Sequence, residues 1–406
     1  MQPELISDCV HCGFCLPTCP TYSLWHEEMD SPRGRIYLMG GLVDGSIELT
    51  DTVVEHFDRC LGCMACVTAC PSGVKYDRLI ETTRAEIEKR HSRGPLDRLL
   101  RSLIFEVFPH RRRLRAALLL RKLPAPGPFR ALKQIAPPWA APEWPPEHTP
   151  GTGPSVALLA GCVQSIVFGD VNAATARVLA ADGYDVHVPR AQGCCGALHV
   201  HAGRLDGGLA RARETIKALE SYELVATNAA GCGSTLKDYT HLLADDPQWA
   251  ERAAAFSAKV RDVSELLANP PAEHAVRKPL RLRVAYQDAC HLRHAQRIVS
   301  EPREALAQIP GLTLLEPAEQ ELCCGSAGIY NIVQPETAAT LGDRKAQNVL
   351  ATEPDAYASA NPGCLVQVSA ALRRAGRALP TVHPVELVDA SIRGISPTEL
   401  LRAARR

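Results

Sequence analysis

Eight cysteines near the amino end form two copies of one motif. The first copy is Cys9-x2-Cys12-x2-Cys15-x3-Cys19-Pro20, and the second is Cys60-x2-Cys63-x2-Cys66-x3-Cys70-Pro71. Three thiolates at two-residue intervals can wrap one face of an iron–sulfur cubane, and this spacing with its trailing proline is typical of [4Fe–4S] ligation. The duplication therefore predicts two [4Fe–4S] clusters and a role in electron transfer.

The fourth cysteine of each motif is expected to ligate the other cluster. The predicted ligand sets are Cys9, Cys12, Cys15 and Cys70 for one cluster, and Cys60, Cys63, Cys66 and Cys19 for the other. Such crossed pairing forces the two segments to lie side by side, close enough for stepwise single-electron transfer. The alternative is zinc, although zinc sites usually combine pairs of ligands separated by a longer loop.

Forty residues separate the two motifs. The sequence predicts helices over residues 21–29 and 33–42, with Ser31 and Pro32 as N-cap and first-turn residues. This helical insert resembles the α-helical ferredoxin arrangement of respiratory iron–sulfur subunits rather than a compact bacterial ferredoxin with β-hairpins. We predict a two-cluster α-helical ferredoxin domain over residues 1–90.

The other eight cysteines repeat as well. The first set is Cys162, Cys194, Cys195 and Cys232, and the second is Cys290, Cys323, Cys324 and Cys364, each with a Cys-Cys-Gly (CCG) unit. The two sets are offset by 128 to 132 residues, which is the size of a domain. We predict two copies of one unit, the first repeat over residues 155–275 and the second repeat over residues 276–406.

Each repeat alternates strand-like and helical runs. Strands are expected at 155–162, 185–189 and 223–232 in the first repeat, and at 281–290, 312–315 and 355–364 in the second, with helices at 172–182, 204–219, 301–309 and 335–350. Such alternation predicts α/β units with parallel sheets, whose sites form at the carboxyl ends of the strands. Since a cysteine follows each of three strands, four thiols per repeat should converge on one edge.

These converging thiols predict a further metal or redox site, and buried structural cysteine is the alternative reading. Several histidines lie near the same segments: His199, His201, His291, His294 and His383. Most such histidines are solvated or satisfied hydrogen bonders. His291 follows Cys290 directly and is a candidate ligand or proton relay.

The stretch between the cysteine-rich parts contains no cysteine. From residue 90 to residue 133 it holds twelve Lys or Arg against Asp97 and Glu106, and ten prolines follow between residues 124 and 154. We predict a basic helical connector and a proline-rich linker over residues 91–154. Neither helix nor sheet is expected to continue through the proline-dense segment at residues 124–154. The basic face is either a solvated helix surface or a docking surface for an acidic partner or an anionic membrane.

The composition and the hydropathy of the chain bear on its partners and its location. Lys plus Arg and Asp plus Glu both number 45, so no basic excess indicates a nucleic-acid partner. No apolar run reaches the length of a membrane span, and no secretory signal is visible at the start. We expect a cytoplasmic chain, with peripheral contact to the cytoplasmic face of the inner membrane as a further option.

The two cluster motifs, the SPRGRIYLM segment at residues 31–39, the GCVQ segment at residues 161–164 and the paired CCG units resemble the iron–sulfur subunit of glycolate oxidase (glycolate dehydrogenase). The resemblance covers nearly the whole chain. It implies a bacterial complex that oxidises glycolate to glyoxylate, in which FAD-binding subunits act on the substrate and this subunit passes electrons to an acceptor, most simply quinone. Related chains serve D-lactate and anaerobic glycerol-3-phosphate dehydrogenases.

The CCG unit is also shared with heterodisulfide reductase, where it ends in Cys-x2-Cys and can hold a noncubane cluster. Here the fifth cysteine is replaced by Thr235 in the first repeat and by Gln367 in the second. That departure argues against a self-sufficient thiol–disulfide enzyme, which stays as an alternative beside a zinc-stabilised interaction module. No glycine-rich dinucleotide fingerprint or P-loop is visible, so we expect flavin or nicotinamide chemistry on partner chains.

Overall fold

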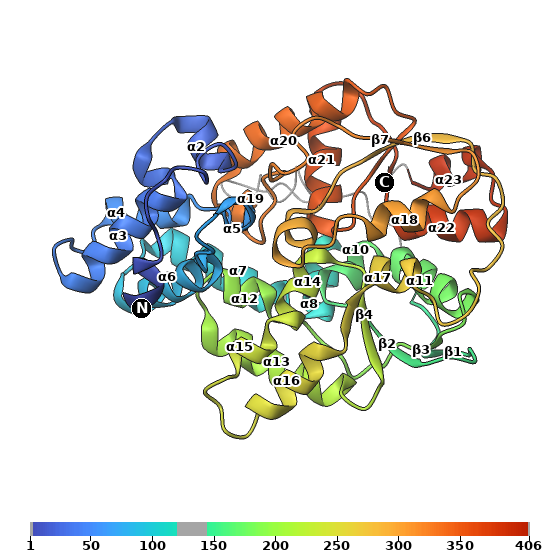
Figure 1. Ribbon diagram of the computed structural model, residues 1–406, viewed down its shortest axis with the longest axis horizontal. Helices are drawn as coiled ribbons and strands as arrows, with labels where there is room; N and C mark the ends of the chain where they lie inside the picture. Colours follow the sequence, from blue (N-terminus) through green and yellow to red (C-terminus); the bar gives the residue numbers. More distant parts are fainter. Residues whose placement is uncertain (1–2, 120–143, 405–406) are drawn as a thin grey trace.

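The computed structural model describes residues 3–119 and 144–404. A helical part near the N-terminus lies at one end of the molecule, and two α/β units stack beside it (Figure 1). The sequence-based fold class is confirmed in both parts. Much of the predicted proline-rich linker lies outside the described residues.

Residues 3–119 are mostly helical and contain no strand. Its elements are α1 (Pro3–Ser7), α2 (Pro20–Trp25), η1 (Glu28–Asp30), α3 (Pro32–Asp44), α4 (Asp51–Asp58), α5 (Ala65–Ala69), α6 (Tyr76–Arg90), α7 (Pro95–Val107) and α8 (Arg111–Leu119). Helix α3 begins as predicted: the Ser31 hydroxyl accepts from the Gly34 N–H at 3.0 Å, and Pro32 occupies the first turn. The helical ferredoxin-like region is thereby confirmed.

The first α/β unit contains five strands: β1 (His148–Thr149), β2 (Ser155–Leu159), β3 (Asp185–His187), β4 (Leu224–Thr227) and β5 (Val260–Asp262). They are ordered β1-β3-β2-β4-β5, and all neighbours are parallel except β1 against β3. The helices are α10 (Val163–Val167), α11 (Gly169–Ala181), α12 (Ala197–His201), α13 (Leu205–Leu219), α14 (Ala230–Lys237), α15 (Tyr239–Leu242), α16 (Ala250–Ala258) and α17 (Val263–Ala268).

The second α/β unit has four parallel strands: β6 (Leu282–Tyr286), β7 (Leu312–Leu315), β8 (Ala356–Ala358) and β9 (Thr381–Val382), ordered β7-β6-β8-β9. Its helical elements are η3 (His291–Ala295, a π-helix), α18 (Glu301–Ala307), α19 (Tyr330–Val333), α20 (Pro335–Leu350), α21 (Pro362–Arg374), α22 (Pro384–Arg393) and α23 (Pro397–Ala403). The strand order matches that of the first unit once β1 is set aside, so the duplication seen in the cysteine spacing extends to topology.

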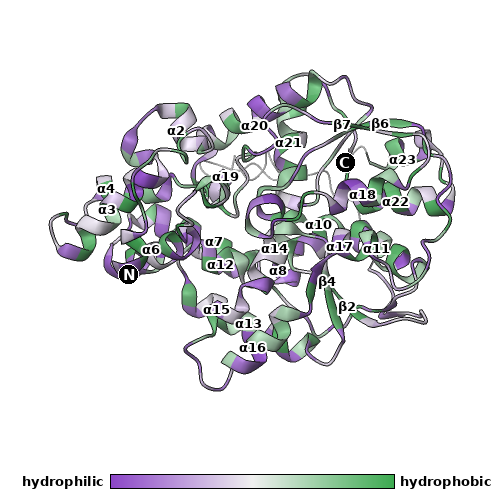
Figure 2. Cartoon of the chain, in the orientation of Figure 1, coloured by the Kyte–Doolittle hydropathy of each residue, from purple (hydrophilic) through white to green (hydrophobic). Residues whose placement is uncertain are grey.

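The two units share one apolar core. Buried residues of β2, such as Val156 and Leu158, belong to the same contiguous cluster as Val284 and Tyr286 of β6. Apolar residues predominate along the labelled strands (Figure 2). Helices α11 and α22 add a lateral contact, in which Arg177 donates to Asp389 at 2.8 Å. The repeats are therefore packed together rather than joined only by the chain.

One expectation about the linker was wrong. Strand β1 lies inside the proline-dense segment where no sheet was expected, between Pro146 and Pro150. The physical reason is that β1 is an antiparallel edge strand of two residues, and edge strands tolerate flanking prolines because one side needs no ladder donors. We propose that the chain divides after residues 90, 154 and 275, with β1 as the part of the linker that joins the first unit.

Candidate iron–sulfur and cysteine sites

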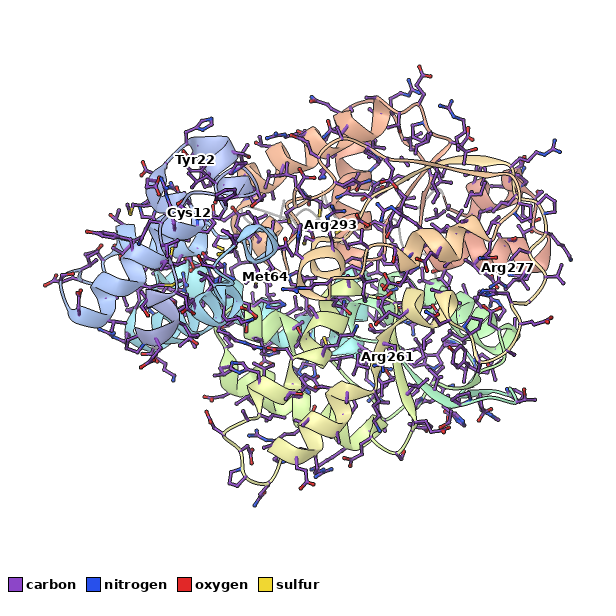
Figure 3. The ribbon with its side chains drawn as sticks, viewed as in Figure 1. Cys12, Tyr22, Met64, Arg261, Arg277 and Arg293 are labelled. Carbon is purple, nitrogen blue, oxygen red and sulfur yellow. The ribbon has the colours of Figure 1, made fainter. Side chains whose placement is uncertain are left out.

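The first predicted cluster set surrounds a small cavity between α3 and the two cysteine motifs. Its cysteines are Cys9, Cys12, Cys15 and Cys70, which line about 30 Å³ of space together with Cys66. Cys12 is exposed, and Figure 3 labels it within the helical part. The four thiols that the spacing assigned to one cluster thus lie around one cavity, including Cys70 from the second motif.

The second predicted set surrounds a separate cavity of about 20 Å³. Its cysteines are Cys19, Cys60, Cys63 and Cys66, and all four are buried. Cys66 also lines the first cavity, so its thiol lies on the wall between the two sites. Cys19 of the first motif thus lines the second cavity, and Cys70 of the second motif lines the first.

Two arginines of the SPRGRIYLM segment support these cavities. Arg33 donates to the His11 carbonyl at 3.0 Å, inside the first cysteine loop, and its guanidinium also binds Glu28 at 2.7 Å. Arg35 is fully buried and donates to the Asp30 carbonyl at 2.5 Å and to the His56 carbonyl at 2.6 Å. One helix therefore braces both cavities, and this accounts physically for the arginine spacing in the segment.

The electrostatic environment differs between the buried thiols. Burial raises the pKa of Cys60, but the Arg35 and Arg84 guanidinium groups outweigh it and hold that pKa below its usual value. Burial raises the pKa of Cys63 and of Cys66 well above the usual value, and neighbouring sulfurs add to the rise. Crowded thiols such as Cys63 and Cys66, whose ionisation is opposed by burial and by neighbouring sulfurs, are expected where a bound cation would supply the missing positive charge.

The donor set fits an iron–sulfur cluster at each cavity. At least four cysteines line each cavity, and the Cys60 sulfur accepts hydrogen bonds from the Gly62 N–H at 3.4 Å and from the Tyr76 hydroxyl at 3.6 Å. Hydrogen bonds to cysteine sulfur are among the features that tune cluster potentials. A cluster held there would supply reversible one-electron chemistry, while the chain contributes ligands, charge and exclusion of water.

The remaining eight cysteines all line a single cavity of about 220 Å³ between the two α/β units. They are Cys162, Cys194, Cys195, Cys232, Cys290, Cys323, Cys324 and Cys364. Within the first set the Cys162 and Cys194 sulfurs lie 3.4 Å apart, and within the second the Cys324 and Cys364 sulfurs lie 3.3 Å apart. The sequence predicted convergence within each repeat but missed that the two sheet edges face each other, because spacing inside a repeat carries no information on how repeats pack.

The glycine of each CCG unit has a clear steric role. Gly196 and Gly325 have φ of +86° and +88°, a region that side chains rarely adopt. A Cβ at Gly196 would lie 2.9 Å from the Gly208 carbonyl oxygen, and one at Gly325 would lie 2.7 Å from that of Ala338. Glycine thus lets the paired cysteines turn into the cavity while the next helix packs against the backbone.

The histidines divide between the cavity and the scaffold. His291 lines the cavity, donates through Nε2 to the Gly62 carbonyl at 2.9 Å and accepts at Nδ1 from the Ser234 hydroxyl at 3.1 Å. His201 also lines the cavity and binds Glu81 at 3.0 Å. His199 packs against Phe105, and His383 caps α22. His291 therefore links the helical part to both units, and its ring nitrogens are already engaged.

The helical part docks directly on the second repeat. Cys63 and Cys323 belong to one apolar cluster, together with Leu61 and Leu322. His294 of η3 accepts at Nδ1 from the Thr68 hydroxyl of α5 at 2.7 Å and donates to the Glu321 carbonyl at 3.0 Å. The buried cysteine set of the helical part thus adjoins the cysteine set of the second repeat rather than that of the first.

A helical two-cluster domain joined to two cysteine-rich repeats defines an iron–sulfur protein of electron transfer. Residues 5–74 match the 4Fe-4S dicluster domain family, and residues 156–237 and 284–369 match the cysteine-rich domain family. The described residues include no helix that is both long and apolar enough to cross a membrane.

Similarity to relatives over nearly the full chain identifies the family to which this iron–sulfur protein belongs. The chain is 41% identical over 420 residues to the "Probable glycolate oxidase iron-sulfur subunit" of Bacillus subtilis, covering 96% of this chain and 93% of the relative. It is 37% identical to the "Glycolate oxidase iron-sulfur subunit" of Escherichia coli, covering 96% and 95%. "Lactate utilization protein A" of Oceanobacillus iheyensis is 29% identical over 58% of this chain and 96% of its own length. The chain belongs to the family of glycolate oxidase iron–sulfur subunits.

Proposed function

We propose that this chain is the electron-transfer subunit of a complex that oxidises glycolate to glyoxylate. FAD-binding partner subunits accept the substrate's electrons, and this chain passes them singly to an acceptor, quinone being the one we propose. The main observation in support of this proposal is that the eight N-terminal cysteines surround two adjacent cavities in the predicted crossed sets. Near full-length similarity to two glycolate oxidase iron–sulfur subunits supports the substrate.

We further propose these eight cysteines as the cluster ligands, in the sets Cys9, Cys12, Cys15, Cys70 and Cys19, Cys60, Cys63, Cys66. The exposed set is the entry or exit point for electrons, because Cys12 reaches the surface whereas the second set is buried. The shared wall at Cys66 keeps the two sites close. Electron transfer then needs no movement of the chain.

We propose that the cavity between the repeats holds a further iron–sulfur or metal site. Its support is the convergence of eight thiols on one space and the adjacency of Cys323 to Cys63. Gln367, which replaces the fifth cysteine of the second repeat, is buried and donates to the Ala338 carbonyl at 2.6 Å. This position is thus part of the scaffold, and each repeat supplies four thiols rather than five.

A specific similarity supports D-lactate as an alternative substrate of the complex. Similarity to lactate utilization protein A extends over 58% of the chain, so a D-lactate dehydrogenase complex is the main alternative. An equivalent role with glycerol-3-phosphate is a further alternative, which rests on the family resemblance of the sequence alone. Acceptor reduction by the purified complex with glycolate, D-lactate or glycerol-3-phosphate distinguishes them, and preference for D-lactate would overturn the glycolate assignment while leaving the electron-transfer role intact.

The electron-transfer role is tested by Cys63→Ala in the whole complex. We expect flavin reduction by glycolate to persist while electron transfer to a quinone acceptor is lost, since the variant removes a ligand of the buried set. Met64→Leu is the matched control, because Met64 is the buried neighbour of Cys63 and keeps its volume. Full quinone-linked activity of Cys63→Ala would refute the proposal. Membrane attachment is tested separately, by release of the complex from membranes in high salt.

A further inference from the structure

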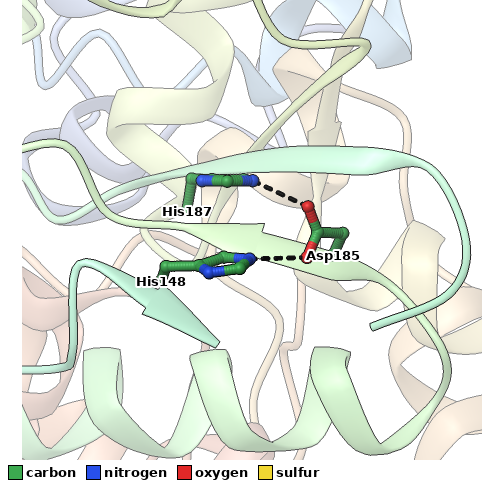
Figure 4. Close-up of side chains that lie close together, drawn as sticks. All are labelled: His148, Asp185 and His187. Atoms are coloured by element: carbon green, nitrogen blue, oxygen red, sulfur yellow. Dashed lines mark hydrogen bonds and ion pairs between the residues drawn. The ribbon is translucent and has the colours of Figure 1, made fainter. Parts of the chain in front are cut away.

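Three potential metal ligands meet at the outer edge of the first sheet, and none of them is a cysteine. His148 Nε2 lies 2.7 Å from Asp185 Oδ1, and His187 Nε2 lies 2.8 Å from Asp185 Oδ2. The imidazole rings stack with centroids 4.5 Å apart and an interplanar angle of 16°. Figure 4 shows both rings directing a nitrogen at the same carboxylate.

The register of the sheet edge brings these residues together. Strand β1 pairs antiparallel with β3, which places His148 opposite His187. Asp185 lies two residues before His187, and side chains at that spacing project from the same face of a strand. The cluster is thus a consequence of one cross-strand pair and of the period of the strand.

We infer that His148, Asp185 and His187 bind a divalent transition-metal ion of the zinc type. Two imidazoles and one carboxylate form a ligand set typical of zinc, with a fourth position left for water. All three ligand atoms lie within 4.8 Å of one another. Bonds of about 2.0–2.1 Å require ligand atoms roughly 3.3 Å apart in tetrahedral geometry, so small side-chain rotations suffice.

The surroundings hold the ligands in place. The Gly151 N–H donates to Asp185 Oδ1 at 3.2 Å and orients the carboxylate. The His187 ring packs against the Tyr222 ring with centroids 5.0 Å apart. Such supporting contacts orient metal ligands in known sites. His148 itself is half exposed, which leaves an entry path for the ion.

A bound ion would stabilise strand β1. Strand β1 has only two residues and one strand partner, so a metal bridge from His148 to β3 would fix the end of the connector to the first repeat. An ion that binds the folded chain and not the unfolded one raises the midpoint of thermal unfolding. The site is therefore structural and independent of electron transfer.

The test compares the anaerobically purified full chain with its His148→Gln/His187→Gln double variant. Glutamine keeps an N–H donor for Asp185 but is a poor zinc ligand. After dialysis against Zn²⁺, we expect the double variant to hold one zinc per chain fewer and to lose the zinc-dependent rise in unfolding midpoint. Any zinc bound by cysteines is common to both proteins and cancels.

His91→Gln is the matched control, because His91 pairs with a single carboxylate, that of Asp51, at 3.4 Å. It should retain the wild-type zinc content. Asp185→Asn is a second variant and should lose the same zinc. Equal zinc content and equal midpoints in wild type and double variant would overturn the inference and leave a hydrogen-bonded cluster only.

Discussion

Ionic contacts made by single residues of the SPRGRIYLM segment explain why few other residue types would fit there. Arg35 lies 3.3 Å from Asp30, and both side chains are buried. Asp30 also binds His56 at 3.0 Å and Arg59 at 2.9 Å, so one carboxylate gathers three basic groups beside Cys60. Buried charges need such partners because the interior does not solvate them. The network sets both the stability of the helical part and the charge near the second cysteine set.

Arg35→Gln should therefore have two effects. Loss of a buried ion-pair partner should destabilise the chain by about 3 kcal/mol. Loss of positive charge near Cys60 should also make a cluster at that set harder to reduce, so its midpoint potential should fall. Denaturant unfolding measures the first effect and an EPR-monitored redox titration the second. Arg35→Lys keeps the charge and should leave the potential near its wild-type value, and equal shifts in both variants would contradict the electrostatic account.

Gly34 lies between the two arginines and has no room for a side chain. A Cβ there would lie 1.9 Å from the Glu28 carbonyl oxygen. Gly34→Ala should thus push α3 away from η1 and cost roughly 2 kcal/mol or more, in the upper range of overpacked cores. Gly45→Ala is the control, since no atom lies within 4 Å of its added Cβ, although its positive φ carries a smaller backbone cost. The free energy of unfolding should be lower for Gly34→Ala than for Gly45→Ala, and the difference should equal the cost of the steric clash at Gly34.

At the scale of elements, the sequence predicted those with strong local signals. Helix α20 was predicted with its observed ends, because Pro335 starts it and apolar periodicity sustains it. Strands β1, β5 and β9 were missed, since each has only two or three residues and, unlike β3 and β8, none leads to one of the repeated cysteines. The π-helix η3 was also missed, and it carries His291 and His294 to the helical part. Docking elements depend on partners distant in sequence, which local pattern does not reveal.

The contact between η3 and α5 should respond to pH. Burial lowers the pKa of His294 below its ordinary value of 6.5, although the Glu321 carbonyl opposes the shift. The unfolded chain then takes up a proton before the folded chain as pH falls, so this stability is present above pH 6.5 and is lost as pH drops toward the lowered pKa. His294→Gln should show a smaller loss of unfolding free energy between pH 7 and pH 5 than wild type.

Anaerobic denaturant unfolding at the two pH values measures this difference. His26→Asn is the control, because His26 is exposed and lies in a left-handed conformation that asparagine tolerates. It should keep the wild-type pH dependence. A His294→Gln variant with the full wild-type loss would assign that loss to other groups.

At the scale of the whole molecule, the helical part and the two α/β units pack together and create a shared cavity and contacts between cysteine sets that no single part contains. The sequence located all sixteen cysteines in four groups of four, because spacing within a motif is local. It could not show that two groups share one cavity or that Cys63 adjoins Cys323, since both follow from contacts between units. Cysteine spacing thus predicts candidate ligands, and packing decides which candidate sites are neighbours.

This asymmetry yields the last prediction. Cys323→Ser/Cys324→Ser changes the cysteine set beside Cys63, whereas Cys194→Ser/Cys195→Ser changes the set of the first repeat, which lines the shared cavity but has no member in the apolar cluster of Cys63. If the cavity holds iron, both variants should contain less iron than wild type while keeping about eight atoms per chain in the N-terminal clusters. Only the second-repeat variant should also shift the EPR signal or midpoint potential of the buried N-terminal cluster, because charge and hydrogen bonding near a cluster set its potential. Identical shifts in both variants would show that the adjacency of Cys63 and Cys323 has no electronic consequence.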